Sequence, residues 1–363
     1  MSNVKGYKDI LAFHPGCYVE DYINELGISQ IEFATRMGTT GKTISKLVNG
    51  QINLSNDLAK KLSVMTGISV ESWLNLQTTY DRKLIEIEKL KEFDAQKEIA
   101  SLIDYSYFVN YAGLPSTRDA RERIANLCKF FTIADIRVLK EQDFLVNFRS
   151  KKGTFELKNE VNSRAWIQTA LNMSRNIETK PYNSEKLKSY LPEIRNMTTM
   201  DPEVFLPRMK DIFAECGVAF VLLPHLKNSG VHGAVRWDNQ DRVVLAMNNR
   251  GVNADIFWFS LFHEIKHVLQ QKLKTVFVVS EELEFKNMDY ELEKEADKFA
   301  SEYLISSRYL NKIIGRKNIS DEDILNFSNE IGIHPGIVVG RLQHEGKLPL
   351  NRGNQFKEKY VIV

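Results

Sequence analysis

The segment from Ile256 to Leu269 constrains the fold most, because it is strongly apolar and yet contains His263-Glu-Ile-Lys-His267. Histidines four residues apart lie one turn apart on the same helical face, so both imidazoles can bind one metal ion. Glu264 follows the first histidine directly, where its carboxylate can reach a water molecule at the metal. The apolar flanks indicate a buried helix rather than a surface helix with two unrelated histidines. We therefore expect the chain to fold around a metal site carried by this helix.

A catalytic zinc site needs three protein ligands and one open position. Downstream, Glu293 and Asp297 lie four residues apart on one helical face, and Ala296 and Ala300 are small enough to pack against the first helix. We predict that Glu293 is the third zinc ligand and that Asp297 bonds the far nitrogen of a ligand histidine.

His263 is the histidine that we expect Asp297 to contact. Glu295 points elsewhere on the same helix, and Glu291 is a weaker alternative ligand. Zinc would lower the pKa of its water to about 7, and Glu264 would take that proton and return it to the leaving amine.

Two further parts of this site are less defined by the sequence. The expected strand Val243–Met247 precedes the metal helix and would bind an extended peptide by edge addition. The residue that stabilises the oxyanion is left open among five candidates: His232, Tyr290, His334, Arg341 and His344.

The two motifs Trp258-Phe-Ser-Leu-Phe-His-Glu-Ile-Lys-His267 and Glu293-Lys-Glu-Ala-Asp-Lys-Phe-Ala300 together resemble the ImmA/IrrE family of metallopeptidases, over about residues 200–345. The resemblance implies the same three metal ligands and Glu264 as the catalytic acid/base. Lys266 departs from it, because a small residue is common there; it puts a long cation beside the site or on the outer side of the helix. The segment Tyr303-Leu-Ile-Ser-Ser307 lacks the proline that often follows in the family.

A second constellation lies in Ile28–Gly50, which predicts two helices joined by a tight turn at Gly38. We expect Ile31, Ala34 and Met37 to form the buried face of the first helix. The expected buried stripe of the second helix consists of Ile44, Leu47 and Val48. The hydroxyl of Thr40 is expected to cap the second helix. The residues predicted to contact DNA are Gln30, Thr40, Gly41, Lys42, Thr43 and Lys46.

The distribution of charge indicates a local positive patch rather than a generally basic protein. Lys+Arg 49 against Asp+Glu 47 gives a net charge of +2 for the whole chain. Within residues 28–50, Arg36, Lys42 and Lys46 oppose only Glu32, so the positive charge lies on the two helices that would meet phosphate. This small excess predicts modest affinity per subunit, and we therefore expect a homodimer on two half-sites.

Four short motifs extend this interpretation over about residues 10–82: Phe13-His-Pro-Gly16, Ile28-Ser-Gln with Phe33-Ala34, Lys42-Thr-Ile-Ser-Lys46, and Trp73-Leu-Asn-Leu-Gln77 with Tyr80. Together they resemble the HigA-type antitoxin branch of the XRE family of repressors. The resemblance implies binding of duplex operator DNA. Because such antitoxins are usually much shorter than this chain, it implies a toxin partner only as an alternative.

The expected fold is mainly α with a small β-sheet. We predict an N-terminal all-α helix-turn-helix domain over residues 1–82, a helical middle region over 83–200, a C-terminal α+β zincin-like metallopeptidase domain over 201–346 and a tail over 347–363. In the third region we expect a helix over Pro202–Glu215 and strands over Val218–Leu223, Ala234–Trp237 and Val243–Met247. Breaks in the helical middle region are expected at Pro115, Pro181 and Pro192, and that region carries no chemical motif.

The amino-acid composition excludes several classes of protein. With 43% apolar and 26% charged residues, the chain is not largely disordered. Three distant cysteines, Cys17, Cys128 and Cys216, fit a reducing cytoplasm and exclude a disulfide scaffold. No signal peptide and no apolar run of membrane-spanning length is visible. We expect a bacterial cytoplasmic protein that is associated with the nucleoid when it is bound to DNA.

The leading hypothesis is a transcriptional regulator of the repressor or antitoxin type, with a zinc-dependent endopeptidase-like domain that cleaves a repressor, a toxin or the chain itself. One alternative is a non-catalytic metal or ligand sensor that controls DNA binding. Another is a long antitoxin that neutralises a toxin. Glu264 favours the peptidase hypothesis, because retention of a metal alone would not require it. Lys266 and the missing proline favour the sensor hypothesis slightly.

Overall fold

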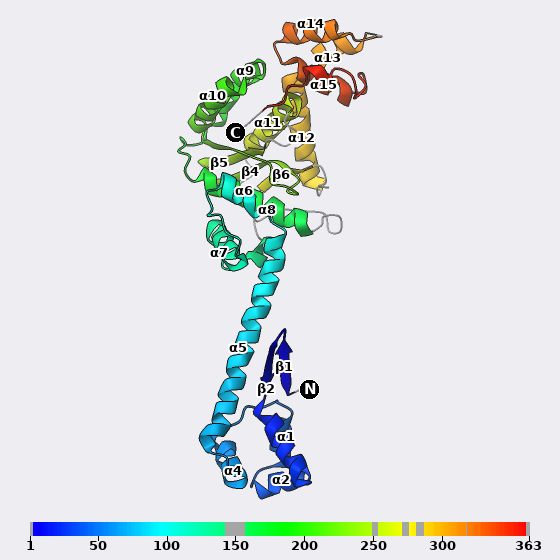
Figure 1. The fold of residues 1–363 in the computed structure, drawn as a ribbon. Coiled ribbons are helices and arrows are strands. Elements are labelled where there is room, and N and C mark those ends of the chain that lie inside the picture. Colours follow the sequence, from blue (N-terminus) through cyan, green and yellow to red (C-terminus); the bar gives the residue numbers. More distant parts are fainter. Residues whose placement is uncertain are drawn as a thin grey trace. The chain divides into compact units, whose positions relative to one another are not determined.

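The computed structural model describes residues 3–141, 157–248, 253–270, 276–280, 287–316 and 318–360. The chain divides into two compact units, Met1–Lys97 and Glu98–Val363 (Figure 1). The domain boundaries expected at residues 82, 200 and 346 stay predictions. Among the described residues, no helix is long and apolar enough to cross a membrane.

The first unit is a small helical bundle preceded by a hairpin. Its elements are β1 (Val4–Tyr7), β2 (Ile10–Phe13), α1 (Pro15–Leu26), α2 (Gln30–Arg36), α3 (Gly41–Val48), α4 (Asn56–Thr66) and most of α5 (Val70–Ser101). Side-chain caps define where the helices begin, since Ser29, Thr40 and Ser55 each accept a hydrogen bond from the first turn of α2, α3 and α4.

The helix-turn-helix pair forms as predicted, with one correction. Ile44, Leu47 and Val48 of α3 are buried. Ile31 is 74% exposed, however, and α2 buries Phe33 in its place. At 100° per residue, the face of α2 that meets the core is centred between Phe33 and Ala34, so Ile31 lies at the border of that face.

The β1–β2 hairpin was not expected in a domain predicted to be all helical. Each strand has only four residues, and Lys8 in the connecting turn has φ of 52° without being a glycine. The hairpin packs against α5, where Ala12 lies in one buried cluster with Tyr80 and Ile87. Tertiary packing rather than local pattern therefore holds these strands, which is why periodicity did not reveal them.

The second unit contains a four-stranded sheet in the order β3-β5-β4-β6. Its strands are β3 (Val218–Leu223), β4 (Val231–Asn239), β5 (Arg242–Asn248) and β6 (Val276–Ser280). Strand β5 pairs with β3 in parallel and with β4 in antiparallel fashion. The expectation that an extended peptide adds to Val243–Met247 is therefore wrong, because both edges of this strand are already occupied. Strand β6, which pairs with β4, was not predicted.

Helices cover both faces of this sheet, with α8 (Leu157–Ser174) on one side and α11 (Ala254–Leu269) on the other (Figure 1). The remaining helical elements are α6 (Tyr105–Tyr111), α7 (Ala120–Phe131), η1 (Ile136–Lys140), α9 (Ser184–Asn196), η2 (Met197–Thr199), α10 (Pro202–Glu215), α12 (Asn287–Leu304), α13 (Ser307–Ile314), α14 (Asp321–Ile331), α15 (Pro335–His344) and η3 (Asn354–Phe356). Helix α10 has the predicted bounds.

The middle region belongs to the same compact unit as the sheet. Side chains from Val161 to Leu171 of α8 are buried on all sides of the helix. The indole of Trp166 donates a hydrogen bond to the carbonyl of Pro224, just after β3, at 3.1 Å. Helix α8 of this region therefore covers one face of the sheet.

Pro192 lies inside α9 and does not break it, contrary to expectation. Leu187, Leu191 and Ile194 anchor this helix in the core, so packing outweighs the loss of one backbone hydrogen bond. After η3 the described tail includes Tyr360, whose hydroxyl accepts a hydrogen bond from Trp258 of α11 at 2.8 Å.

Candidate metal centre

Helix α11 is buried because it lies between the sheet and the helices α12 and α15. It carries His263, Glu264 and His267, all of which are buried. Helix α12 packs closely against it through Ala296 and Ala300, which are fully buried. Small side chains at this contact let the two backbones approach, and the approach brings acidic groups of α12 to the histidines.

Three side chains converge at this contact. The Nε2 atoms of His263 and His267 lie 2.9 Å apart. The carboxylate of Glu293 is 3.1 Å from His263 Nε2 and 3.2 Å from His267 Nε2. These are the ligand atoms of a group that can hold one metal ion. Two imidazole nitrogens and one carboxylate oxygen are a ligand set typical of catalytic zinc sites.

The outer nitrogen of each histidine is also engaged. Asp297 Oδ1 lies 2.9 Å from His263 Nδ1, the contact that we expected. Gln270 Oε1 lies 2.9 Å from His267 Nδ1, and its amide donates to the carbonyl of Leu292 at 3.1 Å. With a metal bound, such contacts would place the ring proton on Nδ1 and leave Nε2 to the metal.

Gln270 was missed by the sequence analysis. It follows the second histidine by three residues on the same helical face, which is the available signal, but glutamine at that spacing is common on helices. Only the packing of α12 shows that its amide reaches the residue before Glu293.

Glu264 is enclosed completely. Neither of its carboxylate oxygens has a hydrogen-bond partner among the described residues. On the facing strand β4, a Cβ atom added to Gly233 would lie 2.4 Å from Glu264 Oε1. The glycine therefore provides the space that the carboxylate occupies. A carboxylate enclosed without partners is costly, which makes a structural role for Glu264 a poor explanation.

The pKa values follow from burial and from neighbours. Burial raises the pKa of Glu264 to about 7. Burial would also raise the pKa of Glu293, but hydrogen bonds from the two histidines outweigh it and lower that pKa. Burial would lower the pKa of His263, whereas hydrogen bonds to Asp297 and Glu293 raise it. The cluster thus keeps an ionised carboxylate in a buried place, which suits a cation.

The other predicted participants lie elsewhere. Glu291 and Glu295 are exposed, and Glu295 is 3.4 Å from Lys266 Nζ. Lys266 also lies over the ring of Phe299, so it packs along α12.

Of the oxyanion candidates, His334 caps α15 by accepting a hydrogen bond from Gly336 N at 3.0 Å. His232 precedes Gly233 on β4. The side chain of Tyr290 lies outside the described residues, and Arg341 and His344 line a neighbouring cavity.

The predicted DNA-contacting residues gather around the start of α3. Thr40, Lys42 and Lys46 are exposed, whereas Gln30, Gly41 and Thr43 are half-buried. Thr40 Oγ1 accepts a hydrogen bond from Thr43 N at 3.2 Å, which caps the helix.

The exposed cations around α3 differ in their partners. Arg36 is paired with Glu32 at 2.5 Å. Lys42 and Lys46 form no ion pair with any residue that the structure describes, and they are the cations left for phosphate.

Comparisons with known proteins match the helix-turn-helix and the metal centre to two different families. Residues 19–73 match the family model described as Helix-turn-helix. Residues 223–343 match a peptidase-family model described as IrrE N-terminal-like domain. The fold and the sites thus define a DNA-binding regulator domain joined to a peptidase-like domain. The chain belongs to the XRE-type helix-turn-helix regulators and carries an ImmA/IrrE-like domain at its C-terminal end.

Two curated relatives illustrate the regulator part. The chain is 34% identical over 86 residues to the Uncharacterized HTH-type transcriptional regulator YddM of Escherichia coli (strain K12), covering 23% of this chain and 92% of the relative. It is 33% identical over 90 residues to Virulence-associated protein I of Dichelobacter nodosus, covering 24% and 83%.

Similar solved structures cover about a quarter of the chain. An addiction module antidote protein of a HigA family from Coxiella burnetii is 26% identical with a TM-score of 0.22, covering 23% of this chain and 92% of that one. The antitoxin GraA is 28% identical with a TM-score of 0.22, covering 25% and 95%.

Proposed function

We propose that this protein is a transcriptional regulator whose C-terminal domain is a zinc-dependent endopeptidase acting on a repressor, a toxin or the chain itself. One observation carries the proposal. Glu264, enclosed and without hydrogen-bond partners, directly follows the first of three side chains whose ligand atoms converge. A binding site for a structural metal has no need of this carboxylate.

The donor set fits zinc, because two imidazole nitrogens and an ionised carboxylate meet, which is the ligand set of catalytic zinc sites that keep one further position for water. A bound zinc ion supplies Lewis-acid chemistry and lowers the pKa of water to about 7. Glu264 then accepts a proton from the attacking water and delivers it to the leaving amine.

Asp297 and Gln270 hold the two imidazoles in orientation. A peptide that adds as a strand has to use an edge of the sheet, which in the described residues means β3 or β6 and not β5.

Metal content tests the site directly. Full-length protein purified without chelators should contain about one zinc ion per chain, as a single site of this kind predicts. His263→Ala should lose the metal, because it removes a ligand. His334→Ala, which removes a histidine that caps α15, is the matched control and should keep the metal. Metal-free wild-type protein, or equal zinc in His263→Ala, would contradict the proposal.

For the N-terminal unit we propose sequence-specific binding of duplex operator DNA by a homodimer, in the bacterial cytoplasm where the chromosome is accessible. Lys46→Ala should weaken binding to all sequences and reduce the salt slope by about 1 if it contacts phosphate. Lys42→Ala should change sequence preference if it contacts a base. Lys60→Ala on α4 is also exposed and serves as the control. Binding selection on random duplexes and titration over salt concentration measure these effects.

A further inference from the structure

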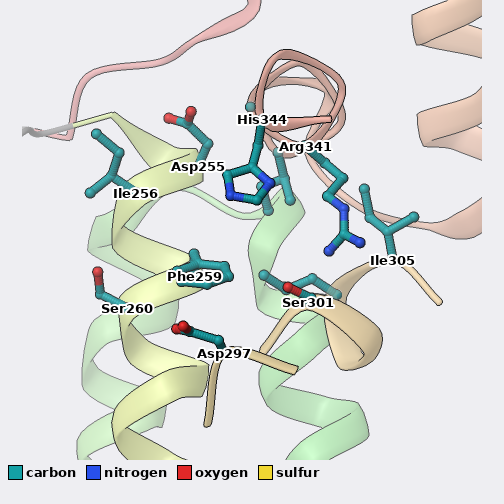
Figure 2. A pocket seen from close by; sticks show the side chains of 12 residues that line it. Asp255, Ile256, Phe259, Ser260, Asp297, Ser301, Ile305, Arg341 and His344 are labelled. Carbon is teal, nitrogen blue, oxygen red and sulfur yellow. The ribbon is translucent and has the colours of Figure 1, made fainter. Parts of the chain in front are cut away.

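A cavity of about 430 Å³ lies in the second unit between α11, α12 and α15 (Figure 2). Its volume is within the range of small-molecule sites. Neither the three proposed metal ligands nor Glu264 lines it. Asp297 does, and the same carboxylate contacts His263. The cavity is therefore a separate site that shares one side chain with the metal centre.

The walls of the cavity are largely apolar. They are formed by Ile256 and Phe259 of α11, Leu304 and Ile305 around the end of α12, and Ile337 of α15. Such walls stabilise a ligand by removing its apolar surface from water. The ligand should therefore have a hydrocarbon body.

Arg341 and His344 extend from α15 toward Phe259 and Ser301 (Figure 2). Arg341 keeps one ion pair, with Glu345 at 2.9 Å. Its buried Nε has no hydrogen-bond partner among the described residues. The two side chains together offer donors to an acceptor group inside the cavity.

The acidic side chains of the wall each have a basic neighbour. Asp255 Oδ2 is 2.8 Å from Lys357 Nζ, while its Oδ1 has no hydrogen-bond partner among the described residues, and Asp297 contacts His263. The hydroxyls of Ser260 and Ser301 also line the cavity, and the side chains of its wall that can meet an anion as cations are those of Arg341 and His344. A planar guanidinium matches the two oxygens of a carboxylate, so one carboxylate is the anionic group that fits.

We propose that this cavity binds an apolar group that carries one carboxylate, with the carboxylate at Arg341 and His344 and the apolar body against Phe259. The occupant also changes the affinity of the metal centre, a consequence that rests on the function proposed above. It would contact Phe259, whose ring centroid is 6.4 Å from that of His263, and Asp297, whose oxygen lies 2.9 Å from His263 Nδ1.

Binding is tested on the full-length protein after treatment with a chelator, by calorimetry with 4-phenylbutyrate. The matched amide, 4-phenylbutanamide, has the same body without the charge and should bind about tenfold more weakly or worse, because charge-assisted hydrogen bonds are the stronger ones. Acetate, which has no apolar body, should show no measurable binding. Equal affinity for the acid and the amide would overturn the proposal.

Variants locate the site. Arg341→Met should weaken binding of 4-phenylbutyrate by about tenfold or more, since it removes the cation. Lys347→Met changes the same charge at an exposed position just after α15 and should leave binding unchanged. Ser301→Phe fills the cavity while the guanidinium of Arg341 is retained, so it tests the site even if Arg341→Met fails to fold. Unchanged binding in either folded variant would refute this location.

An apolar group that carries one carboxylate can belong to a small free acid or to the C-terminal residue of a peptide. A short N-acetylated peptide that ends in phenylalanine separates the two: binding comparable to that of 4-phenylbutyrate supports a chain end, and binding of 4-phenylbutyrate alone supports a free acid.

The coupling between the cavity and the metal centre is measured by competition for zinc with a chromogenic chelator, where 4-phenylbutyrate should shift the zinc affinity about fivefold or more. Absence of a shift would refute the coupling. Because binding is measured without metal or proteolysis, failure of the peptidase proposal would not be mistaken for failure of this one.

Discussion

Replacement of Glu264 by glutamine separates the catalytic role of this residue from metal binding. The two side chains have nearly the same size, so the space beside Gly233 is filled as before. No hydrogen bond is lost within the described residues, because neither oxygen of Glu264 has a partner. None of the three converging ligand atoms belongs to it. Glu264→Gln should therefore fold with an unchanged melting temperature and bind zinc as wild type does.

The expected effect on catalysis is large. A positioned general acid/base contributes about 10²–10⁴-fold in rate. At 1.36 kcal/mol for each factor of ten, this is an increase of about 3–5 kcal/mol in activation free energy. Glutamine cannot accept the proton of the attacking water, so the whole of this contribution should be lost.

Cleavage is followed by mass spectrometry of new chain ends, both in the purified protein and in a bacterial extract incubated with it. A promoter fusion reports the regulatory state in parallel. If the domain is a peptidase, Glu264→Gln should show no new ends and should lock the reporter in one state. If Glu264→Gln regulates as wild type while His263→Ala does not, the domain is a metal sensor and the catalytic argument is refuted.

Three further predictions address separate parts of the structure. Gln270→Ala should weaken zinc binding by about 10–100-fold in chelator competition, since contacts to the outer nitrogen of a ligand histidine have this effect; wild-type affinity would show that the contact is dispensable. Thr40→Ala should lower the free energy of unfolding by about 1 kcal/mol in urea titration of the full-length protein, because it removes the cap of α3. Gly233→Val should displace Glu264 and abolish cleavage while one zinc per chain remains, and retained cleavage would show that the glycine is not needed.

Local sequence predicted the elements whose pattern is strong and whose ends are marked. Helix α10 has the expected bounds and β3 does too, because a proline begins the first and an apolar run defines the second. The hairpin β1–β2 and the strand β6 were missed because short strands are held by pairing and packing partners distant in sequence. Ile31 was misplaced because three apolar residues on a short helix leave the centre of its buried face undetermined.

The sequence by itself determined which residues of α11 share one face, since four residues make about one turn of any α-helix. It also determined that Glu293 and Asp297 share a face of α12. Only the tertiary structure decided that the two faces meet, that the amide of Gln270 reaches Leu292, and that Gly233 faces Glu264. The physical reason is that helical periodicity is local, whereas these contacts join segments about twenty to thirty residues apart whose approach is set by Ala296, Ala300 and the sheet on which α11 packs.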